Sequence, residues 1–292
     1  MPLDDIVQNK IEKIGSLPTL PDIVVRLMQT VNNPNVSSSD IADLISRDIS
    51  LSAKILRLAN SAFYGMPKTI TTLNSAIVLL GLRVIATIVL SLTVFDIFPR
   101  DKKSTLFNRK AFWYHSIMTG SIAKLIAQRR DDTLHIDPDE AFCAGLLHDI
   151  GKIVMEQYFH DNLHTVMGHF VNGTKSLVTV EQEILNFTHA DIGRHLTMQW
   201  QLPEELFTAI ANHHDPMVAG VAHPLSALCH VADRLFYDLE LDAQVPPAPA
   251  KPTLDHHAFD MVGLMDHEIE SLKNSLKIEQ MKVEAFYAIA QS

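Results

Sequence analysis

The feature that most constrains the fold is a long apolar run from Ser75 to Phe98, SAIVLLGLRVIATIVLSLTVFDIF. A segment of this length can cross a bilayer. However, Gly81 interrupts the run and Arg83 lies inside it. A central arginine costs about 2.5 kcal/mol or more in a membrane. We therefore predict two buried helices within a globular core, and we expect no association with a membrane.

The remainder of the chain is typical of a helical protein. The 292 residues are sufficient for one large domain or two ordinary ones, and 47% of them are hydrophobic. Leu, Ala and Ile are prominent, which favours helices. Because no segment shows the sustained alternation of a strand, an all-α fold is predicted.

The first hundred residues are predicted to form short helices joined by tight turns. Ile23, Leu27 and Val31 recur at helical spacing. The serine and aspartate cluster before DIADLIS can cap that helix, and Ser50 can cap the next one, LSAKILRLANSA. Asn60 is expected to cap or bridge helices within this part.

A second part begins near residue 100 with a predicted amphipathic helix, LFNRKAFWYHSIMTGSIAKLIAQRR, whose stripe includes Phe112, Ser116, Thr119 and Ala123. Asp137 and Pro138 predict a further helix start. The proline- and alanine-rich stretch AQVPPAPAKPT predicts a semi-rigid linker before one last helix. The predicted divisions are an N-terminal helical subdomain at 1–100, a second helical subdomain at 101–240, a linker at 241–253 and a C-terminal helical segment at 254–292.

Charge and cysteine content narrow the possible partners and compartment. The net charge is −10, which disfavours direct nucleic-acid binding because that function needs a basic surface. Cys143 and Cys229 lie in hydrophobic contexts and are predicted to be buried, reduced thiols. The sequence MPLDDIVQNKIEK is acidic and lacks the apolar core of a signal peptide, so a cytoplasmic protein is expected.

The chemistry concentrates in GLLHDIGK, where an imidazole, a carboxylate and an ammonium lie inside an apolar run. Buried charge is costly unless something binds it. His148 and Asp149 leave a helix roughly 100° apart, which allows both to bind one cation. Fifteen histidines occur in the chain, and several others lie beside acids on predicted helices. Such a mixture of imidazoles and carboxylates suits Fe, Mn or Zn better than Ca or Mg.

Other histidines carry weaker signals. His160 and His164 have the i, i+4 spacing of a zinc-binding helix but lack the accompanying glutamate, which favours a solvated helix face. The pair at 256–257 is expected to be exposed. Arg194 and His195 either line a phosphate pocket or face water.

Several motifs in order resemble a known family. His115, the pair His148-Asp149 and Asp233 resemble the H…HD…D signature of the HD superfamily of metal-dependent phosphohydrolases. HDIGK, HADIGRHL and NHHDP are similar to the HD-GYP branch, the cyclic-di-GMP phosphodiesterases. LPTLPDIVVRLM, SSSDIADLISRDISLSAKILRLANSAFYG and AIVLLGLRVI are similar to the HDOD family, the HD-related output domains. The combined resemblance covers about residues 12–240.

The resemblance implies an all-helical, HD-like bundle with two divalent metals, Fe or Mn, with Zn and Ni as alternatives. By that resemblance Asp149 bridges the two metals and Lys152 lies near a substrate phosphate, so these two are the implied catalytic residues. The implied ligands of the first metal are His115, His148, Asp149 and Asp233. Those of the second are Asp149, His189 and His213, with His214 as an additional ligand.

Two departures bear on function. The GYP element is missing, since PMVAGVAHP follows the paired histidines, and Ala111 stands where some relatives carry a glutamate for a third metal. The resemblance therefore implies two metals, and two functions stay open. One is a signal-transduction module with a regulatory or ligand-sensing metal site. The other is an active phosphohydrolase on a nucleotide or cyclic dinucleotide. Signalling proteins, a nucleotide ligand and a second copy of the chain are the expected partners.

Overall fold

The computed structural model of the chain describes residues 17–31, 36–98, 107–218, 221–239, 241 and 255–291. The predicted all-α fold is confirmed: within these ranges the one exception is the short antiparallel pair β1 (Met217–Val218) and β2 (Val221–Ala222). The helices are α2 (Asp22–Thr30), α3 (Ser38–Ser46), α4 (Ile49–Ala59), α5 (Leu73–Leu80), α6 (Leu82–Ile97), α7 (Arg109–Arg129), α8 (Asp131–Leu134), α9 (Pro138–Leu147), α10 (Ile150–Tyr158), α11 (His160–Val171), α12 (Leu177–Leu185), α13 (His189–Gln199), α14 (Glu204–Asn212), α15 (Pro224–Asp238), α16 (His256–Val262) and α17 (Asp266–Ala290).

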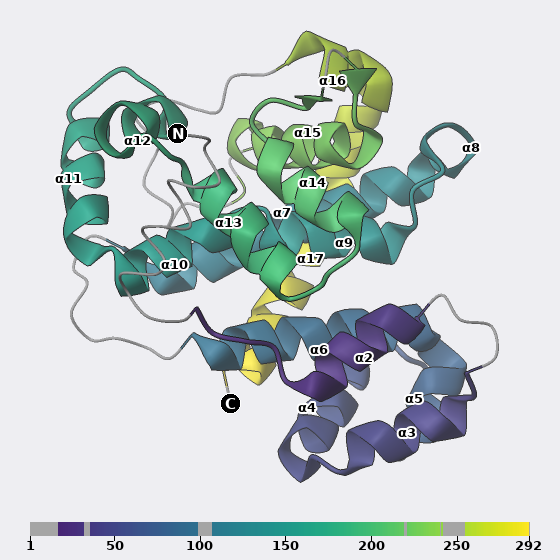
Figure 1. Cartoon of the computed structure of the whole chain (residues 1–292). Coiled ribbons are helices and arrows are strands. Elements are labelled where there is room, and N and C mark those ends of the chain that lie inside the picture. Colours follow the sequence, from purple (N-terminus) through teal and green to yellow (C-terminus); the bar gives the residue numbers. More distant parts are fainter. Residues whose placement is uncertain are drawn as a thin grey trace.

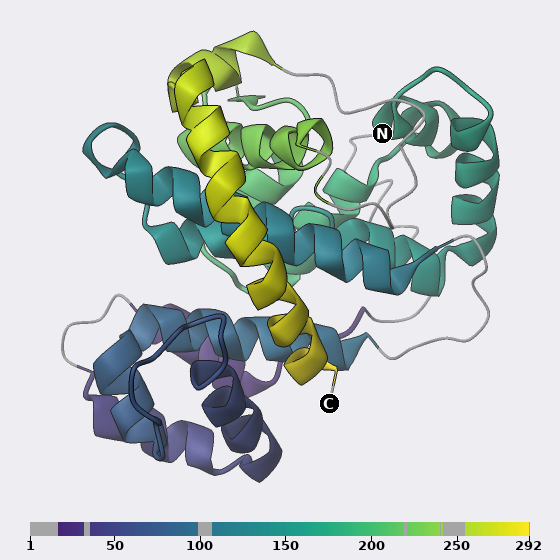
Figure 2. The ribbon, with the colours of Figure 1, turned by 180° about the vertical axis from the view of Figure 1, so that it is seen from behind.

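The helices form two lobes (Figure 1). Helices α2 to α6 make the N-terminal lobe, drawn in purple and blue, and α7 to α16 make the larger second lobe. Helix α17, drawn in yellow, runs from the second lobe down to the first (Figure 2). Apart from residue 241, the predicted linker at 241–253 lies outside the described residues.

Side-chain caps define the helices of the N-terminal lobe. Ser37 accepts a hydrogen bond from the Asp40 amide at 3.1 Å, so the predicted serine and aspartate cap of α3 is confirmed. The predicted cap of the next helix at Ser50 is wrong. Asp48 caps α4 by accepting from the Leu51 amide at 2.9 Å, because the chain stays extended at Asp48 and is already helical at Ile49.

The apolar run forms two helices that meet at a bend of 118°. Gly81 lies at the bend with φ +92°, a conformation that L side chains rarely adopt. Helix α6 is buried, as predicted, but α5 is buried on one side only: Val78 is 66% exposed and Leu79 is 58% exposed. Among the described residues, no single helix has both the length and the apolar character needed to cross a membrane.

Asn60 joins two segments of the N-terminal lobe, as the sequence predicted. Its side-chain oxygen accepts a hydrogen bond from the Ile70 amide at 2.7 Å. Its side-chain nitrogen donates to the carbonyl oxygens of Leu56 and Ile70, each at 2.8 Å. The end of α4 is thereby fixed to the segment that precedes α5.

Helix α7 is the centre of the second lobe, and the prediction of a simple amphipathic helix is wrong. Residues 115–123 are buried without interruption. The reason is that α9, α15 and α17 all pack against α7, so several of its faces are covered (Figures 1 and 2). The polar residues on it, including Ser116 and Thr119, are therefore core residues.

The crossing of α7 and α9 depends on two glycines. A Cβ added at Gly145 would lie 2.6 Å from the Cα atom of Gly120, and one added at Gly120 would lie 2.8 Å from the carbonyl oxygen of Phe142. No larger residue fits at either position without moving a backbone. This close approach places the middle of α7 beside the end of α9.

Both cysteines are buried and free, as predicted. Burial raises the pKa of the Cys143 thiol to about 12 and also raises that of Cys229. Neither thiol is therefore a thiolate near neutral pH.

Helix α17 packs on both lobes. It contacts α7 in the second lobe and α4 and α6 in the first. Phe286 is fully buried, and its ring lies 5.0 Å from that of Phe63 and 6.3 Å from that of Phe142, measured between ring centroids. The C-terminal segment thus completes the core between the lobes.

Candidate metal centre

The sequence GLLHDIGK does not form one continuous helix. Helix α9 ends at Leu147 and α10 begins at Ile150, so His148 and Asp149 occupy the corner between them. The prediction that these two side chains leave a single helix roughly 100° apart is therefore replaced by a corner geometry. Asp149 itself has φ −98° and ψ 9°, which ends the α9 hydrogen-bond ladder.

The seven predicted metal-ligating side chains lie together in the second lobe. His115 comes from the middle of α7, His189 is the first residue of α13, and Asp233 is on α15. His213 and His214 follow the end of α14. All but His214 are buried, and His214 is partly buried.

A second close glycine contact joins the two halves of the cluster. A Cβ at Gly151 would lie 1.9 Å from the carbonyl oxygen of His189. Helix α10 therefore touches the first turn of α13, and Asp149 lies next to His189 as a result. On α13, Gly193 leaves space for the side chains of Ile150 and Ile210.

One group of donor atoms surrounds a first position. His115 Nε2 lies 3.2 Å from His148 Nε2, 3.6 Å from Asp149 Oδ2 and 3.1 Å from Asp233 Oδ1. His148 Nε2 lies 3.3 Å from the same Asp149 oxygen. Neighbouring ligands of a metal with bonds of about 2.0–2.2 Å are separated by about 3 to 3.5 Å, so the spacing fits one cation.

The other oxygen of Asp149 belongs to a second group. Asp149 Oδ1 lies 3.2 Å from His189 Nε2 and 3.6 Å from His213 Nε2. His214 Nε2 lies 2.9 Å from His189 Nε2. The carboxylate of Asp149 therefore faces both groups, one through each oxygen, which is the arrangement a bridging ligand requires.

Hydrogen bonds at the far ring nitrogens orient two of the imidazoles. The Nδ1 atom of His148 lies 2.7 Å from the carbonyl oxygen of Gly145, and that of His213 lies 2.7 Å from the carbonyl oxygen of Ile210. A carbonyl only accepts, so Nδ1 carries the proton and Nε2 is directed into the centre. Outer partners of this kind are typical of metal-ligating histidines.

The chemistry of the donor set fits divalent metal. Asp149 Oδ1 and His213 Nε2 are buried atoms without a hydrogen-bond partner among the described residues. A cation at the second position would satisfy both. Among the described residues, the groups of three or more His, Cys, Asp or Glu donors within metal-binding distance of one another are His115, His148 and Asp149, and Asp149, His189, His213 and His214. Asp233 approaches His115 and His148 but lies outside the first of these groups.

In the metal-free protein, protonated side chains balance the charge of the buried carboxylates, as the directions of the pKa shifts indicate. Burial disfavours charge on Asp149, but His148 and Lys152 outweigh it and hold its pKa well below the usual range. Burial likewise opposes protonation of His189, yet Glu181 raises the pKa of this imidazole to about 9. Burial lowers the pKa of His213 to about 4. Protons and a lysine thus hold part of the charge that metal ions would supply.

Lys152 lies at the edge of the centre. Its ammonium donates to Asp149 Oδ2 at 2.6 Å, and its side chain is 18% exposed. Burial opposes its charge, but the contact with Asp149 outweighs burial and raises the lysine pKa. Lys152 is therefore a charged group beside the carboxylate that faces both metal positions.

Sequence reasoning missed Glu181, which is fully buried and accepts a hydrogen bond from His189 Nδ1 at 2.7 Å. A signal was present. Glu181 lies at helical spacing between Leu177 and Leu185, so an acid interrupts the apolar stripe of α12.

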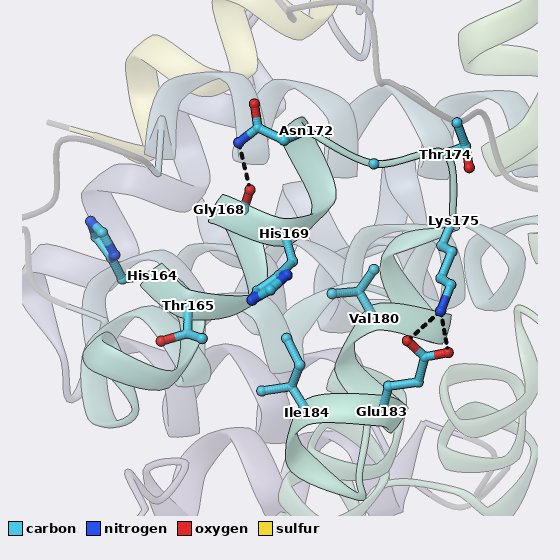
Figure 3. A pocket seen from close by; sticks show the side chains of 11 residues that line it. His164, Thr165, Gly168, His169, Asn172, Thr174, Lys175, Val180, Glu183 and Ile184 are labelled. Carbon is cyan, nitrogen blue, oxygen red and sulfur yellow. Dashed lines mark hydrogen bonds and ion pairs between the residues drawn. The ribbon is translucent and has the colours of Figure 1, made fainter.

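His160 and His164 are exposed on α11, as expected. His164 lines a hollow of about 800 Å³ between α11 and α12, where Lys175 and Glu183 form an ion pair at 2.6 Å (Figure 3). The exposed pair at 256–257 also agrees with its prediction. Arg194 and His195 are half-buried on α13.

The comparisons identify the family. The sequence profile of the HDOD domain matches residues 17–216. The chain belongs to the HDOD family. An uncharacterized protein of Treponema pallidum is 29% identical over 204 residues, which are 70% of this HDOD chain and 39% of the relative. The chain thus spans about two fifths of the length of this curated relative.

Three solved structures, one of them an HDOD protein, share the fold. An HDOD protein of unknown function from Geobacter sulfurreducens has a TM-score of 0.77 at 24% identity, over 98% of this chain and 96% of that one. A protein from Shewanella amazonensis provisionally named a phosphohydrolase has a TM-score of 0.74 at 24% identity, over 97% and 98%. One from Marinobacter aquaeolei provisionally named a signal transduction protein has a TM-score of 0.81 at 20% identity, over 99% and 66%. At these identities the likeness concerns the fold.

Proposed function

We propose that this HDOD protein is a signal-transduction module whose two-metal centre acts as a regulatory output or ligand-sensing site. The observation that carries the proposal is Asp149, whose two oxygens face two separate groups of imidazoles. Fe or Mn fits these ligands, with Zn and Ni as alternatives. The solved structure from Marinobacter aquaeolei, which bears a signal-transduction name, supports the signalling role.

The metal ions would join segments that are far apart in the sequence. The ligands come from α7, from the corner between α9 and α10, and from α13, the end of α14 and α15. A metal that binds only the folded arrangement stabilises it by mass action. Metal or ligand binding would then change the surface offered to signalling proteins, to a nucleotide or to a second copy of the chain. Direct nucleic-acid binding is not proposed, because the net charge is −10.

A phosphohydrolase acting on a nucleotide or cyclic dinucleotide is the second candidate, and Lys152 is the observation that favours it. Two bound metals would polarise a phosphate and lower the pKa of a bound water. Lys152 lies against Asp149 and is partly exposed, so its ammonium can reach a phosphate at the edge of the centre and offset its charge. The provisional name of the Shewanella amazonensis structure agrees with this candidate.

One experiment separates the two candidates. The purified protein is loaded with Fe(II) or Mn(II), its metal content is measured by elemental analysis, and hydrolysis of bis-p-nitrophenyl phosphate and cyclic-di-GMP is assayed. Two bound metals without turnover support the module. Metal-dependent turnover that disappears in Asp149→Ala establishes the enzyme instead. Fewer than two metals per chain in the loaded wild type refutes the two-metal centre.

A further inference from the structure

Glu181 lies outside the seven proposed ligands, yet it is one of the most deeply buried charged groups of the described chain. Its exposed fraction is 0%. One oxygen, Oε2, accepts from the His189 ring at Nδ1 (2.7 Å) and from the His189 backbone amide (3.0 Å). The other oxygen, Oε1, has no hydrogen-bond partner among the described residues. Burying a carboxylate in this way costs free energy unless a nearby positive charge pairs with it.

Helix capping does not account for this charge. Thr188 already caps α13 by accepting from the Asp191 amide at 3.3 Å, and Asp191 accepts from the Thr188 amide at 2.7 Å. A neutral acceptor would serve the His189 amide equally well. The negative charge of Glu181 therefore acts on the imidazole.

His189 differs from two other proposed ligands, His148 and His213, in the group that accepts the hydrogen bond from its Nδ1 atom. His148 and His213 direct Nδ1 to carbonyl oxygens three residues earlier in their own segments, and those acceptors are neutral. His189 alone among these three has a carboxylate partner, and that partner comes from another helix, α12. A carboxylate fixes the Nδ1–H tautomer and raises the basicity of Nε2. Nε2 of His189 is the atom that faces Asp149 Oδ1 and His214 Nε2.

We infer that Glu181 is a positioning residue that sets the metal affinity of the second position, through the imidazole of His189. The inference rests on the proposed two-metal centre and concerns only its second position. The two metal positions then differ in their histidines: His148 at the first has a neutral outer partner, whereas His189 at the second has a carboxylate. The two positions should therefore bind their metal ions in two separable steps.

The test is a titration of metal-free protein with Co(II), followed by equilibrium dialysis and by the visible absorbance of the bound ion. Glu181→Gln keeps an acceptor of similar shape and removes the charge. We expect the second Co(II) to bind about 10–100-fold more weakly in this variant, with the first unchanged. Glu183→Gln is the matched control, because Glu183 is exposed on the same helix and pairs with Lys175. This control should bind both ions as the wild type does.

If Glu181 only stabilised the fold of α13, its replacement would loosen that helix as well as weaken metal binding. Amide hydrogen exchange of α13 in the metal-free variants reports whether the helix itself has loosened, and Glu181→Asp restores the charge on a shorter side chain. Weaker second binding with unchanged α13 exchange, partly rescued by Glu181→Asp, supports the inference. Two ions bound with wild-type affinity by Glu181→Gln overturn it, as does affinity loss that merely follows loss of α13 protection. A wild type that binds fewer than two ions contradicts the proposed function itself.

Discussion

Gly151 and His189 approach so closely that even a methyl group cannot fit between them, since a Cβ at Gly151 would lie 1.9 Å from the His189 carbonyl oxygen. This contact joins α10, which directly follows Asp149, and α13, which begins at His189. Backbone atoms cannot move aside as a flexible side chain does. The distance between Asp149 and His189 is therefore set by the absence of a side chain.

We expect Gly151→Ala to push α13 away from α10 and to weaken metal binding at the second position. Overpacking of this kind costs about 1–3 kcal/mol or more. Gly168→Ala is the control, because Gly168 lies within α11 with nothing within 4 Å of its added Cβ. That change should stabilise the protein by up to about 1 kcal/mol. Urea unfolding and metal analysis measure both effects, and equal stability of the two variants would contradict the prediction.

Asp149 and His189 should have different effects on metal content. Asp149→Ala removes the carboxylate that faces both groups, so both metals should be lost. His189→Ala removes a donor of the second group alone, so one metal should remain. Elemental analysis of the dialysed proteins gives the ratio directly. A single remaining metal in Asp149→Ala would show that the two positions do not share this residue.

Lys152 should compete with metal at Asp149. Its ammonium lies 2.6 Å from Asp149 Oδ2, the oxygen that also faces the first group of histidines. Lys152→Met removes this competing charge and leaves the buried carboxylate unbalanced in the metal-free protein. We therefore expect a lower melting temperature without metal and a larger rise in melting temperature when Mn(II) is added. A rise equal to that of the wild type would argue against competition.

The stability of the metal-free protein should fall both when the pH rises above about 6.5 and when it drops below about 6.5. Burial opposes charge on His189, but Glu181 raises its pKa to about 9. A group whose pKa is raised by folding contributes stability that is complete below its unfolded value of about 6.5 and is lost as the pH rises through 9. Burial lowers the pKa of His213 to about 4, so stability also falls as the pH drops from 6.5 toward 4.

Urea unfolding after metal removal, at pH 4.5, 6.5 and 9, measures this dependence. The free energy of unfolding should be highest near pH 6.5. His189→Gln should flatten the alkaline side and leave the acidic side. Stability that increases from pH 6.5 to 9 in the wild type would contradict the role given to Glu181 and His189.

Helix α17 is expected to contribute strongly to stability through one residue. Phe286 is fully buried against Phe63 and Phe95, and truncation of a buried phenylalanine costs about 3–5 kcal/mol. Phe286→Ala should therefore lower the free energy of unfolding by that amount. Met281→Ala, at a position 66% exposed on the same helix, should change it by less than about 0.5 kcal/mol. Similar losses in both variants would mean that the helix does not pack as described.

Much of the fold follows from local sequence signals, and the failures have physical causes. The Gly81 break and the capping of α3 could be predicted because each depends on neighbouring residues. The burial of α7 could not, because its polar residues are covered by helices distant in the sequence. The pattern favours Ser50 as a cap, but Asp48, two residues earlier, has the same capability and is the actual cap.

The candidate site also has some features that local sequence signals predict and others that they do not. The motifs predict the seven proposed ligands, but they do not predict the corner at His148 and Asp149. Periodicity alone continues the helix through GLLHDIGK, and the break is visible only in three dimensions. Glu181 was missed because its partner lies on another helix, although its place on an apolar stripe was readable.

The position of α17 also has a consequence for biosynthesis. The helix lies after both lobes in the sequence, so a ribosome completes the two lobes before the helix that joins them is made. Until then Phe63, Phe95 and Phe142 lack their shared partner Phe286. Until this helix emerges and packs, the nascent chain exposes an apolar surface between its lobes, the kind of surface through which folding intermediates aggregate.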